Sequence, residues 1–182
     1  MRIIGGSLKG KNILPPANYG ARPTTDFAKE GLFNILINEY DIEDLSVLDL
    51  FSGTGSISLE FASRGCTDII SVEMNPVHAK FIKQVVQAYK VKGMQVVRHN
   101  AFEFINICTK KFDIIFLDPP YKTAYGEQAM QLILNLNLLK EDGLLIFEHA
   151  KDKPEYDYSG YELLVQKKYG IKMVSYFRVQ HD

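Results

Sequence analysis

The sequence lacks the apolar segments that would place it in or across a membrane. None of its apolar runs approaches the ~20 consecutive residues that a membrane-spanning helix needs. The start of the chain, residues 1–6, also lacks the long apolar stretch of a secretory signal peptide. We therefore expect a cytoplasmic protein with no membrane partner.

Residues that bind metals or form disulfides are few. The chain has two cysteines, whose positions show neither metal-binding nor redox spacing. Its four histidines are scattered, and none is paired with another histidine or with a cysteine. We expect no metal site, and we expect both cysteines to be small buried apolar residues. The residues concerned are Cys66, Cys108, His78, His99, His149 and His181.

The net charge is only −1, which argues against a wholly basic nucleic-acid-binding protein. The charge is nevertheless unevenly distributed. Residues 1–25 contain Arg2, Lys9, Lys11 and Arg22 and no acidic residue, so this segment carries +4 and the remainder carries −5. Such a segment is either a local anion-binding surface or a solvated terminus, and its charge alone does not decide between them.

What is present is a regular alternation of strand and helix patterns in a chain of 182 residues, a length that suits one domain. Short apolar runs predict strands, and periodic apolar stretches between them predict helices. Strands that are apolar along their whole length are typical of a parallel sheet covered by helices on both faces. The expected strands are residues 47–51, 69–73, 95–99, 112–117 and 144–148, and the expected helices between them are residues 55–64, 76–89, 101–109 and 129–136.

The C-terminal part departs from this alternation. Residues 161–169 and 171–179 give two strand patterns with no helix between them, which predicts an antiparallel pair at one edge of the sheet. The sum is a mostly parallel seven-stranded α/β sheet with helices on both faces. For two helices we also expect defined buried stripes. These are Phe27, Gly31, Leu32, Ile35 and Leu36 in the first, and Val77, Phe81, Val85 and either Ala88 or Tyr89 in the other.

The N-terminal part is rich in glycine and proline. Residues 2–4 and 12–14 can pair as a small β-hairpin around the intervening glycines. A helix then begins near Thr25 or Asp26, which are good capping residues. We therefore divide the chain into an N-terminal extension, residues 1–25, and a single globular domain, residues 26–182.

The loop after the first expected strand has the composition of a nucleotide-binding turn. Gly53 and Gly55 permit a tight turn and a close backbone approach to a ligand where the next helix begins. Ser58 stands at the third glycine position of the dinucleotide fingerprint. Asp49 would repel a pyrophosphate but suits a ligand that carries an ammonium group. A plain strand-to-helix turn is the alternative that the glycines alone leave open.

Polar residues also follow the next two strands, where open α/β sheets bind their ligands. Glu73, about 20 positions after the glycine loop, can accept both hydroxyl protons of a ribose, or it can be a solvated charge. Asn100 can hydrogen-bond an adenine edge, although a helix N-cap explains it equally well. Together these loops suggest a pocket for an adenosine that carries an amino acid, as S-adenosylmethionine (SAM) does.

These segments resemble the class I methyltransferases, which share a D-x-F-x-G-x-G loop, an acid ending the second strand and an antiparallel seventh strand. All three features occur between residues 47 and 179. The resemblance implies the Rossmann-like fold of that class, SAM as methyl donor and S-adenosylhomocysteine as product. It also implies a set of cofactor contacts, which are Asp49, Phe51, Gly53, Gly55, Glu73, Met74, Asn100 and Ala101.

The fourth expected strand is followed by Asp118, Pro119, Pro120 and Tyr121. The methyltransferases that this segment resembles act on a planar nitrogen, either an exocyclic base amine or a glutamine amide. The lone pair of such a nitrogen is delocalised, so the Asp118 carboxylate and the Pro119 carbonyl would bind its N–H groups and favour localisation of the pair. The prolines fix φ and offer no competing donor. Tyr121 would stack on the base, which must be unpaired or flipped out.

The N-terminal segment closely resembles the RsmD-like bacterial methyltransferases, which methylate the N2 amine of a guanine in 16S ribosomal RNA. The matching stretches are R-I-I-G-G at residues 2–6 and R-P-T-T-D at residues 22–26. Lys29 stands where the family often has arginine. A lysine keeps the positive charge but cannot bind a phosphate in the bidentate way that arginine does. The alternative to RNA contact is that Lys29 lies on a solvated face of its helix. The resemblance implies RNA contacts from Arg2, Lys9, Lys11, Arg22, Thr24, Thr25 and, more weakly, Lys29.

The implied partner is 16S rRNA within the small ribosomal subunit or its precursor, and we expect a monomer because no spare apolar helix is evident. Three alternatives stay open. An adenine-N6 methyltransferase usually has a separate target-recognition domain, for which there is no length here. A non-catalytic RNA-binding assembly factor would not need the intact segments at residues 49–55 and 118–121. A nicotinamide-dependent oxidoreductase is disfavoured by Asp49 and by the missing third glycine.

Overall fold

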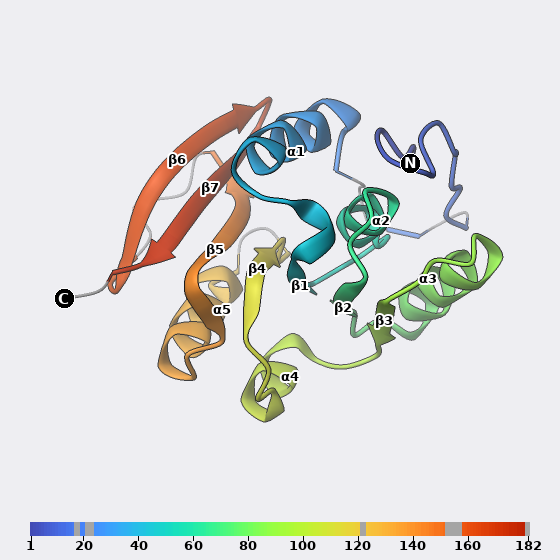
Figure 1. The fold of residues 1–182 in the computed structure, drawn as a ribbon. Helices are drawn as coiled ribbons and strands as arrows, with labels where there is room; N and C mark the ends of the chain where they lie inside the picture. The colour runs from blue at the N-terminus through green and yellow to red at the C-terminus, as the bar shows by residue number, and fades with distance from the viewer. Residues whose placement is uncertain (17–18, 21–23, 121–122, 152–157, 181–182) are drawn as a thin grey trace.

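The structure is a computed structural model, and it describes residues 1–16, 19–20, 24–120, 123–151 and 158–180. One seven-stranded sheet runs through it in the order β3-β2-β1-β4-β5-β7-β6 (Figure 1). The strands are β1 (Ser46–Leu50), β2 (Asp68–Val72), β3 (Met94–Val97), β4 (Phe112–Leu117), β5 (Leu139–Ala150), β6 (Tyr161–Tyr169) and β7 (Lys172–Val179).

Strand directions agree with the sequence-based prediction. Strands β1 to β5 pair in parallel, whereas β7 pairs antiparallel with both β5 and β6. The order reverses at β1, from which the chain first goes outward to β3 and then returns to β4. The predicted Rossmann-like α/β fold with its antiparallel edge pair is therefore confirmed. A ligand site is expected beside this reversal, at the carboxyl ends of the strands.

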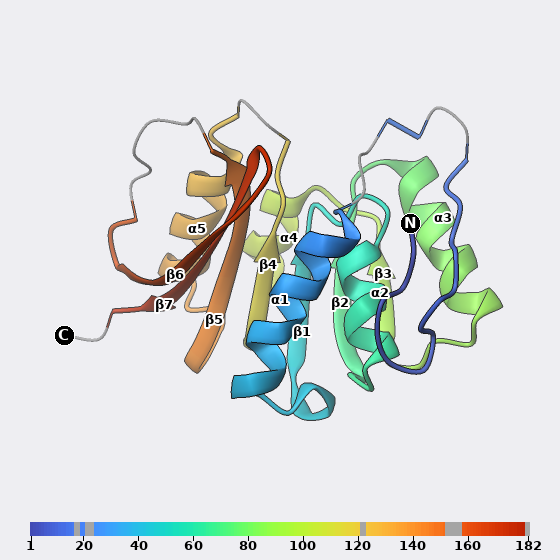
Figure 2. The same ribbon diagram turned by 90° about the horizontal axis from the view of Figure 1, so that it is seen from above.

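Helices cover both faces of the sheet (Figure 2). One face packs against α1, α2 and α3, and the other packs against α4 and α5. In the part of the chain that the structure describes, no helix combines the length and apolar character needed to cross a bilayer. The helices are α1 (Asp26–Glu39), α2 (Ser56–Ser63), α3 (Pro76–Ala88), α4 (Ala101–Ile107) and α5 (Tyr125–Asn135), with a short 3-10 turn η1 (Ile42–Asp44).

Helix starts follow the capping chemistry of the sequence. Thr25 is the N-cap of α1, and its Oγ1 accepts a hydrogen bond from the Ala28 N–H at 3.2 Å. Asn75 caps α3 in the same way, with Pro76 at the first helical position, where a missing N–H costs nothing. These caps place both helix starts at the same edge of the sheet as the carboxyl ends of the parallel strands.

The predicted buried stripes are partly wrong. The Phe27 side chain is 70% exposed, because the first turn of α1 lies at the sheet edge, where this ring contacts only the edge of Tyr169. Val77 is 57% exposed in the first turn of α3, and Ile82 takes its place in the core. Cys66 is buried as predicted, whereas Cys108 is only half-buried. The residues that α1 buries are Ala28, Lys29, Leu32, Phe33 and Leu36.

The N-terminal hairpin is reduced to a single antiparallel bridge between Arg2 and Asn12. Backbone hydrogen bonds flank the bridge, from the Ile3 N–H to the Lys11 carbonyl and from the Ile13 N–H to the Met1 carbonyl. Regular pairing does not extend further, because the N–H groups of Ile4, Ser7 and Leu8 donate to α2 instead. Ile3 and Ile13 are both buried in the same core cluster as α1, α2 and α3. Residues 1–13 therefore share the core of the domain, while the division of the chain at residue 25 stays a prediction.

Candidate functional site

A pocket of about 850 Å³ opens where β1, β2, β3 and β4 end. Its walls come from the loops that follow these strands and from Tyr19 and Gly20 of the N-terminal segment. Of the eight residues predicted to contact a cofactor, all except Gly55 line this pocket. The seven that do so are Asp49, Phe51, Gly53, Glu73, Met74, Asn100 and Ala101.

The glycine loop has the left-handed backbone that its composition suggests. Gly53 and Gly55 have φ of 55° and 72°, in the left-handed region that side chains disfavour. A Cβ on Gly55 would also lie 3.0 Å from Ile82 of α3. Gly55 is thus required by the turn and by helix packing, although it does not line the pocket.

Asp49 is a buried carboxyl, only 2% exposed, at the end of β1. Burial raises its pKa to about 7, although hydrogen bonds from Ser58 and Ser52 oppose part of this rise. Ser58 Oγ donates to Asp49 Oδ2 at 2.6 Å. Ser58 was noticed in the sequence only as a missing glycine, but in the structure it holds the Asp49 carboxyl in place.

Glu73 connects the ends of two loops. Its Oε2 accepts the Gly53 N–H at 2.8 Å, and its Oε1 accepts the Asn75 N–H at 2.7 Å. Each carboxylate oxygen has a second lone pair, so these bonds leave Glu73 able to accept further donors from a ligand. Glu73 is only 8% exposed, so it is not the solvated strand-end charge that the sequence left open as an alternative.

Asn100 acts as the N-cap of α4, which was one of its two interpretations from the sequence. Its Oδ1 accepts the N–H groups of Phe102 and Glu103 at 2.9 and 3.3 Å. Its NH₂ group points the other way and lies 3.7 Å from the sulfur of Met74. A ligand in the pocket would therefore meet the donor side of this amide rather than its oxygen.

Tyr19 is a pocket residue that sequence reasoning missed. Its hydroxyl donates to the Gly53 carbonyl at 2.9 Å, and its ring stacks on His78 with centroids 3.9 Å apart. A ring nitrogen of His78 lies 2.7 Å from the Tyr19 carbonyl oxygen. Burial, and then the nearby Glu73, raise the pKa of Tyr19 above its usual value, so the hydroxyl stays a donor. No local pattern marks this residue, because its partners lie far along the chain.

Phe102 and Tyr125 escaped prediction, and with the predicted Phe51 they form an aromatic wall. Phe102 makes edge contacts with Phe51 and Tyr125, at centroid separations of 6.0 and 5.3 Å. All three rings line the pocket. Such a surface suits a flat apolar ring system.

Asp118 follows β4 at the pocket, as predicted. Leu117 pairs with Phe147 of β5, so Asp118 lies beside Glu148 at the next position. Burial raises the pKa of Asp118 well above its usual range, and Glu148 and Asp49 raise it further, while Lys172 acts in the opposite direction. A carboxyl in this position binds a proton more readily than an exposed carboxyl does.

The prolines after Asp118 have different surroundings. Pro119 is buried and lines the pocket, whereas Pro120 is exposed. The Pro120 carbonyl accepts a hydrogen bond from Thr123 Oγ1 at 2.7 Å, which stabilises the turn. Tyr121, predicted to stack on a base, lies outside the described residues.

The predicted RNA contacts are placed in several different surroundings. Lys9 and Lys11 are exposed, and Arg2 is exposed but pairs with Asp26 at 2.9 Å. Thr24 is buried and lines the pocket, while Thr25 caps α1. Arg22 lies outside the described residues.

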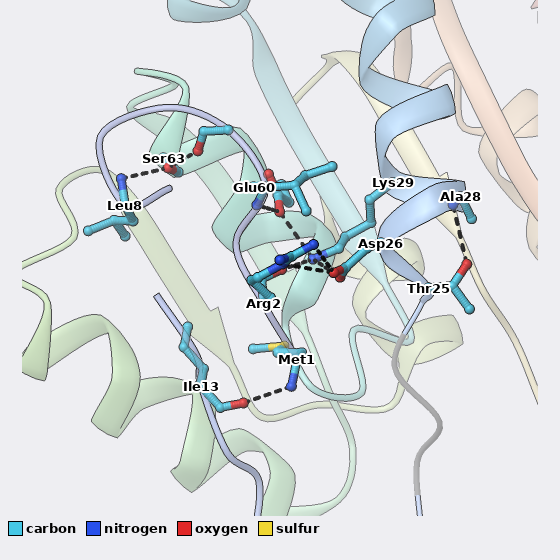
Figure 3. Close-up of polar contacts among 12 residues, drawn as sticks. Met1, Arg2, Leu8, Ile13, Thr25, Asp26, Ala28, Lys29, Glu60 and Ser63 are labelled. Carbon is cyan, nitrogen blue, oxygen red and sulfur yellow. Dashed lines mark hydrogen bonds and ion pairs between the residues drawn. The ribbon is translucent and has the colours of Figure 1, made fainter. Parts of the chain in front are cut away.

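The predicted RNA contact of Lys29 is wrong, and so is its alternative as a solvated residue. The side chain is fully buried and pairs with Glu60 of α2 at 3.1 Å, and it also donates to the Arg2 carbonyl (Figure 3). The helix turns this position toward α2 rather than toward solvent. Glu60 is the sequence signal that was overlooked, since it is the one charged residue of α2.

Glu60 and Ser63 of α2 also hold the N-terminal backbone (Figure 3). Glu60 Oε1 accepts the Ile4 N–H at 2.7 Å. Ser63 Oγ accepts the Leu8 N–H at 2.9 Å and donates to the Gly5 carbonyl at 2.5 Å. The segment that carries Arg2, Lys9 and Lys11 is therefore anchored to the domain at several points.

The described residues contain no candidate metal site. No group of three or more of their His, Cys, Asp or Glu side chains is arranged to hold a metal ion.

Known proteins resemble this chain over nearly its whole length. A family model described as "Conserved hypothetical protein 95" matches residues 1–178. The ribosomal RNA small subunit methyltransferase D of Haemophilus influenzae is 34% identical over 180 residues, covering 97% of this chain and 91% of that protein. The protein of the same name from Escherichia coli K12 is 32% identical over 148 residues, covering 81% of this chain and 74% of that protein.

Solved structures show the same architecture. The yhhF protein of Escherichia coli superposes with a TM-score of 0.87 and 26% identity, covering 99% of this chain and 98% of that one. The HI0767 protein of Haemophilus influenzae gives a TM-score of 0.81 and 30% identity, with the same coverage of 99% and 98%. The shared structure therefore includes the N-terminal segment as well as the sheet.

Proposed function

Because this chain belongs to the RsmD-like family, whose model is described as "Conserved hypothetical protein 95", we propose that it transfers a methyl group from SAM to the exocyclic N2 amine of a guanine in 16S ribosomal RNA. The observation that carries the proposal is the shared pocket. In it, the half-buried acceptor Asp118 and seven of the eight predicted cofactor residues face one cavity. The names of the two relatives, small-subunit ribosomal RNA methyltransferases, support the substrate class.

The pocket's own chemistry fits SAM. Asp49 and Glu73 are buried acids, and the ligand carries an ammonium group, a sulfonium and two ribose hydroxyls. Asp49 suits the ammonium group and Glu73 suits the hydroxyls. Phe102 and Tyr125 offer an apolar wall to the adenine. When bound, SAM supplies a methyl group that is already activated by its positive sulfur.

Asp118 would hold the amine that receives the methyl group. An exocyclic amine is a weak nucleophile because its lone pair is delocalised into the base. Hydrogen bonds from its N–H groups to the Asp118 carboxylate and the Pro119 carbonyl favour a localised pair directed at the methyl carbon. The nitrogen–carbon bond forms as the carbon–sulfur bond breaks, and one N–H proton then leaves toward Asp118. Most of the rate gain would come from orientation and exclusion of water.

The exposed cations near the N-terminus would contact the phosphate backbone. Lys9 and Lys11 are exposed and lie on a segment that Glu60 and Ser63 hold against α2. Phosphate contacts position a protein on RNA, while the flipped base is read in the pocket. An acidic body with one basic segment is consistent with a substrate in which RNA is already part of a ribonucleoprotein particle.

Methyl transfer from labelled SAM tests the proposal directly. Unmodified small subunits, free 16S rRNA and DNA would each be incubated with the protein, and the labelled nucleosides identified. We expect N2-methylguanosine from subunits or rRNA. Formation of N6-methyladenine, or labelling of DNA alone, would overturn the proposal.

Variants of β4 test the role of Asp118. We expect Asp118→Ala to lower the rate by at least about 10²-fold, because the amine loses its acceptor, and Asp118→Asn to retain part of the activity through its remaining oxygen. Asp113→Asn is the matched control, since Asp113 lies on the same strand but binds Ser46 and Lys140 at its other end. Full activity of Asp118→Ala would remove Asp118 from the mechanism.

A further inference from the structure

The buried Glu148 and the half-buried Lys172 form an ion pair at the proposed methyl-transfer site, and neither was predicted from the sequence. The Lys172 ammonium group donates to Glu148 Oε1. Glu148 is 1% exposed at the end of β5, and Lys172 begins β7 and lines the pocket. Glu148 pairs with Val174 and Ala150 pairs with Lys172, which puts both side chains on one face of the sheet.

Asp118 lies on that same face. Phe116 pairs with Ile146, and two residues further along both parallel strands come Asp118 and Glu148. Side chains two apart on a strand share a face, so both carboxyls point to the side of the sheet covered by α1, α2 and α3. The strand ends therefore bring the Asp118 and Glu148 carboxyls and the Lys172 ammonium group to the same face of the sheet, beside the proposed position of the target amine.

This arrangement is costly, which argues that it has a use. Burying an ion pair seldom adds stability over apolar residues of the same volume. Among the described residues, Glu148 Oε2 is also buried without a hydrogen-bond partner. A sheet end that only needed to be filled would be filled more stably by apolar side chains.

We propose that Glu148 and Lys172 are positioning residues that set the charge of Asp118, with Lys172 keeping it ionised and Glu148 strengthening it as a proton acceptor. The inference rests on the proposed function and concerns the same site. Asp118 must be ionised to accept N–H groups from the amine, and it must also take a proton readily once the methyl group has moved. A proton acceptor meets both needs best when its pKa is near the working pH.

Several other charged or titratable groups face the same cavity. Asp49 approaches from β1 and opposes the ionisation of Asp118. Across the pocket lie Glu73, His78, His99, Tyr19 and Tyr125. Among the described residues that change the pKa of Asp118, Lys172 favours its ionised form. The charge of the side chain that each substitution removes therefore sets the direction in which the titration midpoint of Asp118 moves.

Titration of the free protein tests the inference without any substrate. The Asp118 carboxyl carbon would be followed by NMR with labelled aspartate and assigned by its loss in Asp118→Asn. We expect Lys172→Met to raise the titration midpoint of Asp118 by about 1 pH unit and Glu148→Gln to lower it by about as much. Lys140→Met is the control, because Lys140 forms its ion pair with Asp113 at the far edge of the same strands.

Two further variants guard against misfolding. Lys172→Met leaves a buried carboxylate unpaired, so the double variant Glu148→Gln/Lys172→Met removes both charges. We expect its midpoint to lie between those of the single variants, and Lys172→Arg to titrate like the unchanged protein. Midpoints that stay in place, or that move in the same direction for Lys172→Met and Glu148→Gln, overturn the inference.

The pH dependence of kcat connects the titration to catalysis. Activity falls as the pH drops through the midpoint of Asp118, because the protonated carboxyl no longer accepts both N–H groups. The acid limb of the kcat profile is therefore expected to move to higher pH for Lys172→Met and to lower pH for Glu148→Gln. An acid limb that stays fixed while the titration midpoint moves overturns the catalytic role of the pair. The titration itself needs no methyl transfer, so it separates this failure from a failure of the proposed function.

Discussion

Lys29 Nζ lies 3.1 Å from Glu60 Oε1, and both side chains are fully buried. This pair joins α1 to α2. The same Glu60 oxygen accepts the Ile4 N–H, and Lys29 donates to the Arg2 carbonyl. One buried ion pair therefore connects two helices and the N-terminal segment that carries the exposed lysines. Lys29, which the family resemblance assigned to RNA, instead determines where the N-terminal segment lies.

Removing Lys29 should destabilise the protein strongly. Lys29→Met removes the nearer cation from the buried Glu60 carboxylate, which keeps only Arg64 Nε at 3.7 Å, and this should cost about 3 kcal/mol in the free energy of unfolding. The double variant Lys29→Met/Glu60→Gln should lose less than the sum of the single losses, because the buried carboxylate is then removed together with its ammonium partner. Urea unfolding measures all three.

Lys110→Met is the control for that series. Lys110 pairs with Asp68 on the exposed surface, and its loss should cost less than about 1 kcal/mol. Equal destabilisation by Lys29→Met and Lys110→Met would contradict the buried pair as an anchor.

Substitutions at two glycines of the N-terminal segment distinguish the stability cost of backbone strain from that of close packing. Gly6 and Gly10 have φ of 73° and 84°, but a Cβ on Gly6 would lie 1.8 Å from the Ser63 carbonyl oxygen, whereas one on Gly10 meets nothing within 4 Å. Gly10→Ala should cost about 1–2 kcal/mol from backbone strain alone. Gly6→Ala adds overpacking and should cost about 2–5 kcal/mol. Thermal unfolding that ranks them equally would contradict the docking of this segment on α2.

Tyr19→Phe tests the contact between the N-terminal segment and the glycine loop. The variant keeps the ring that stacks on His78 and removes only the hydrogen bond to the Gly53 carbonyl. We expect SAM to bind about 3–10-fold more weakly in calorimetry, the effect of one hydrogen bond. Tyr40→Phe is the control, since Tyr40 contacts Arg178 away from the pocket. Unchanged affinity in Tyr19→Phe would show that this bond does not support the cofactor site.

SAM affinity should depend on pH through Asp49. The pKa of Asp49 is about 7 in the free protein, and an ammonium group binds only its ionised form. Binding therefore releases a proton, and affinity should fall about tenfold from pH 8 to pH 6 as Asp49 becomes protonated. Calorimetry in buffers of different ionisation enthalpy measures the released proton.

Asp49→Asn provides the comparison for that measurement. It should bind SAM weakly and lose this pH dependence, while titration of the ligand's own amine remains in both proteins. A pH dependence that persists unchanged in Asp49→Asn would assign it to another group.

Much of the pocket was predictable because local chemistry specified it. Asp49 lies near the end of an apolar strand, Glu73 and Asp118 each follow one, and the ends of parallel strands meet at one edge of the sheet. Asn100 could not be resolved between ligand contact and helix cap, because an amide at the start of a helix serves either role. Only the direction of its oxygen in the structure shows the cap.

Lys29 and Lys172 show what local chemistry leaves open. Both lysines have the sequence surroundings of exposed residues, and both are withdrawn from solvent by a partner acid on another element. Those acids are 31 and 24 positions away in the chain. Tyr19 is similar, since Gly53 and His78 lie 34 and 59 positions beyond it.

The sequence by itself determined the order of strands and helices, the antiparallel edge and the residues at the strand ends, because periodicity, capping and turn chemistry act over a few residues. The tertiary structure alone decided which charges are buried and paired. Charge pairing depends on distances between elements that are remote in the chain, and the cost of burying a charge is met only where a partner is brought to it. Thus Asp118 could be predicted from its place after an apolar strand, whereas the Glu148–Lys172 pair depends on the pairing of β5 with β7, which only the structure shows.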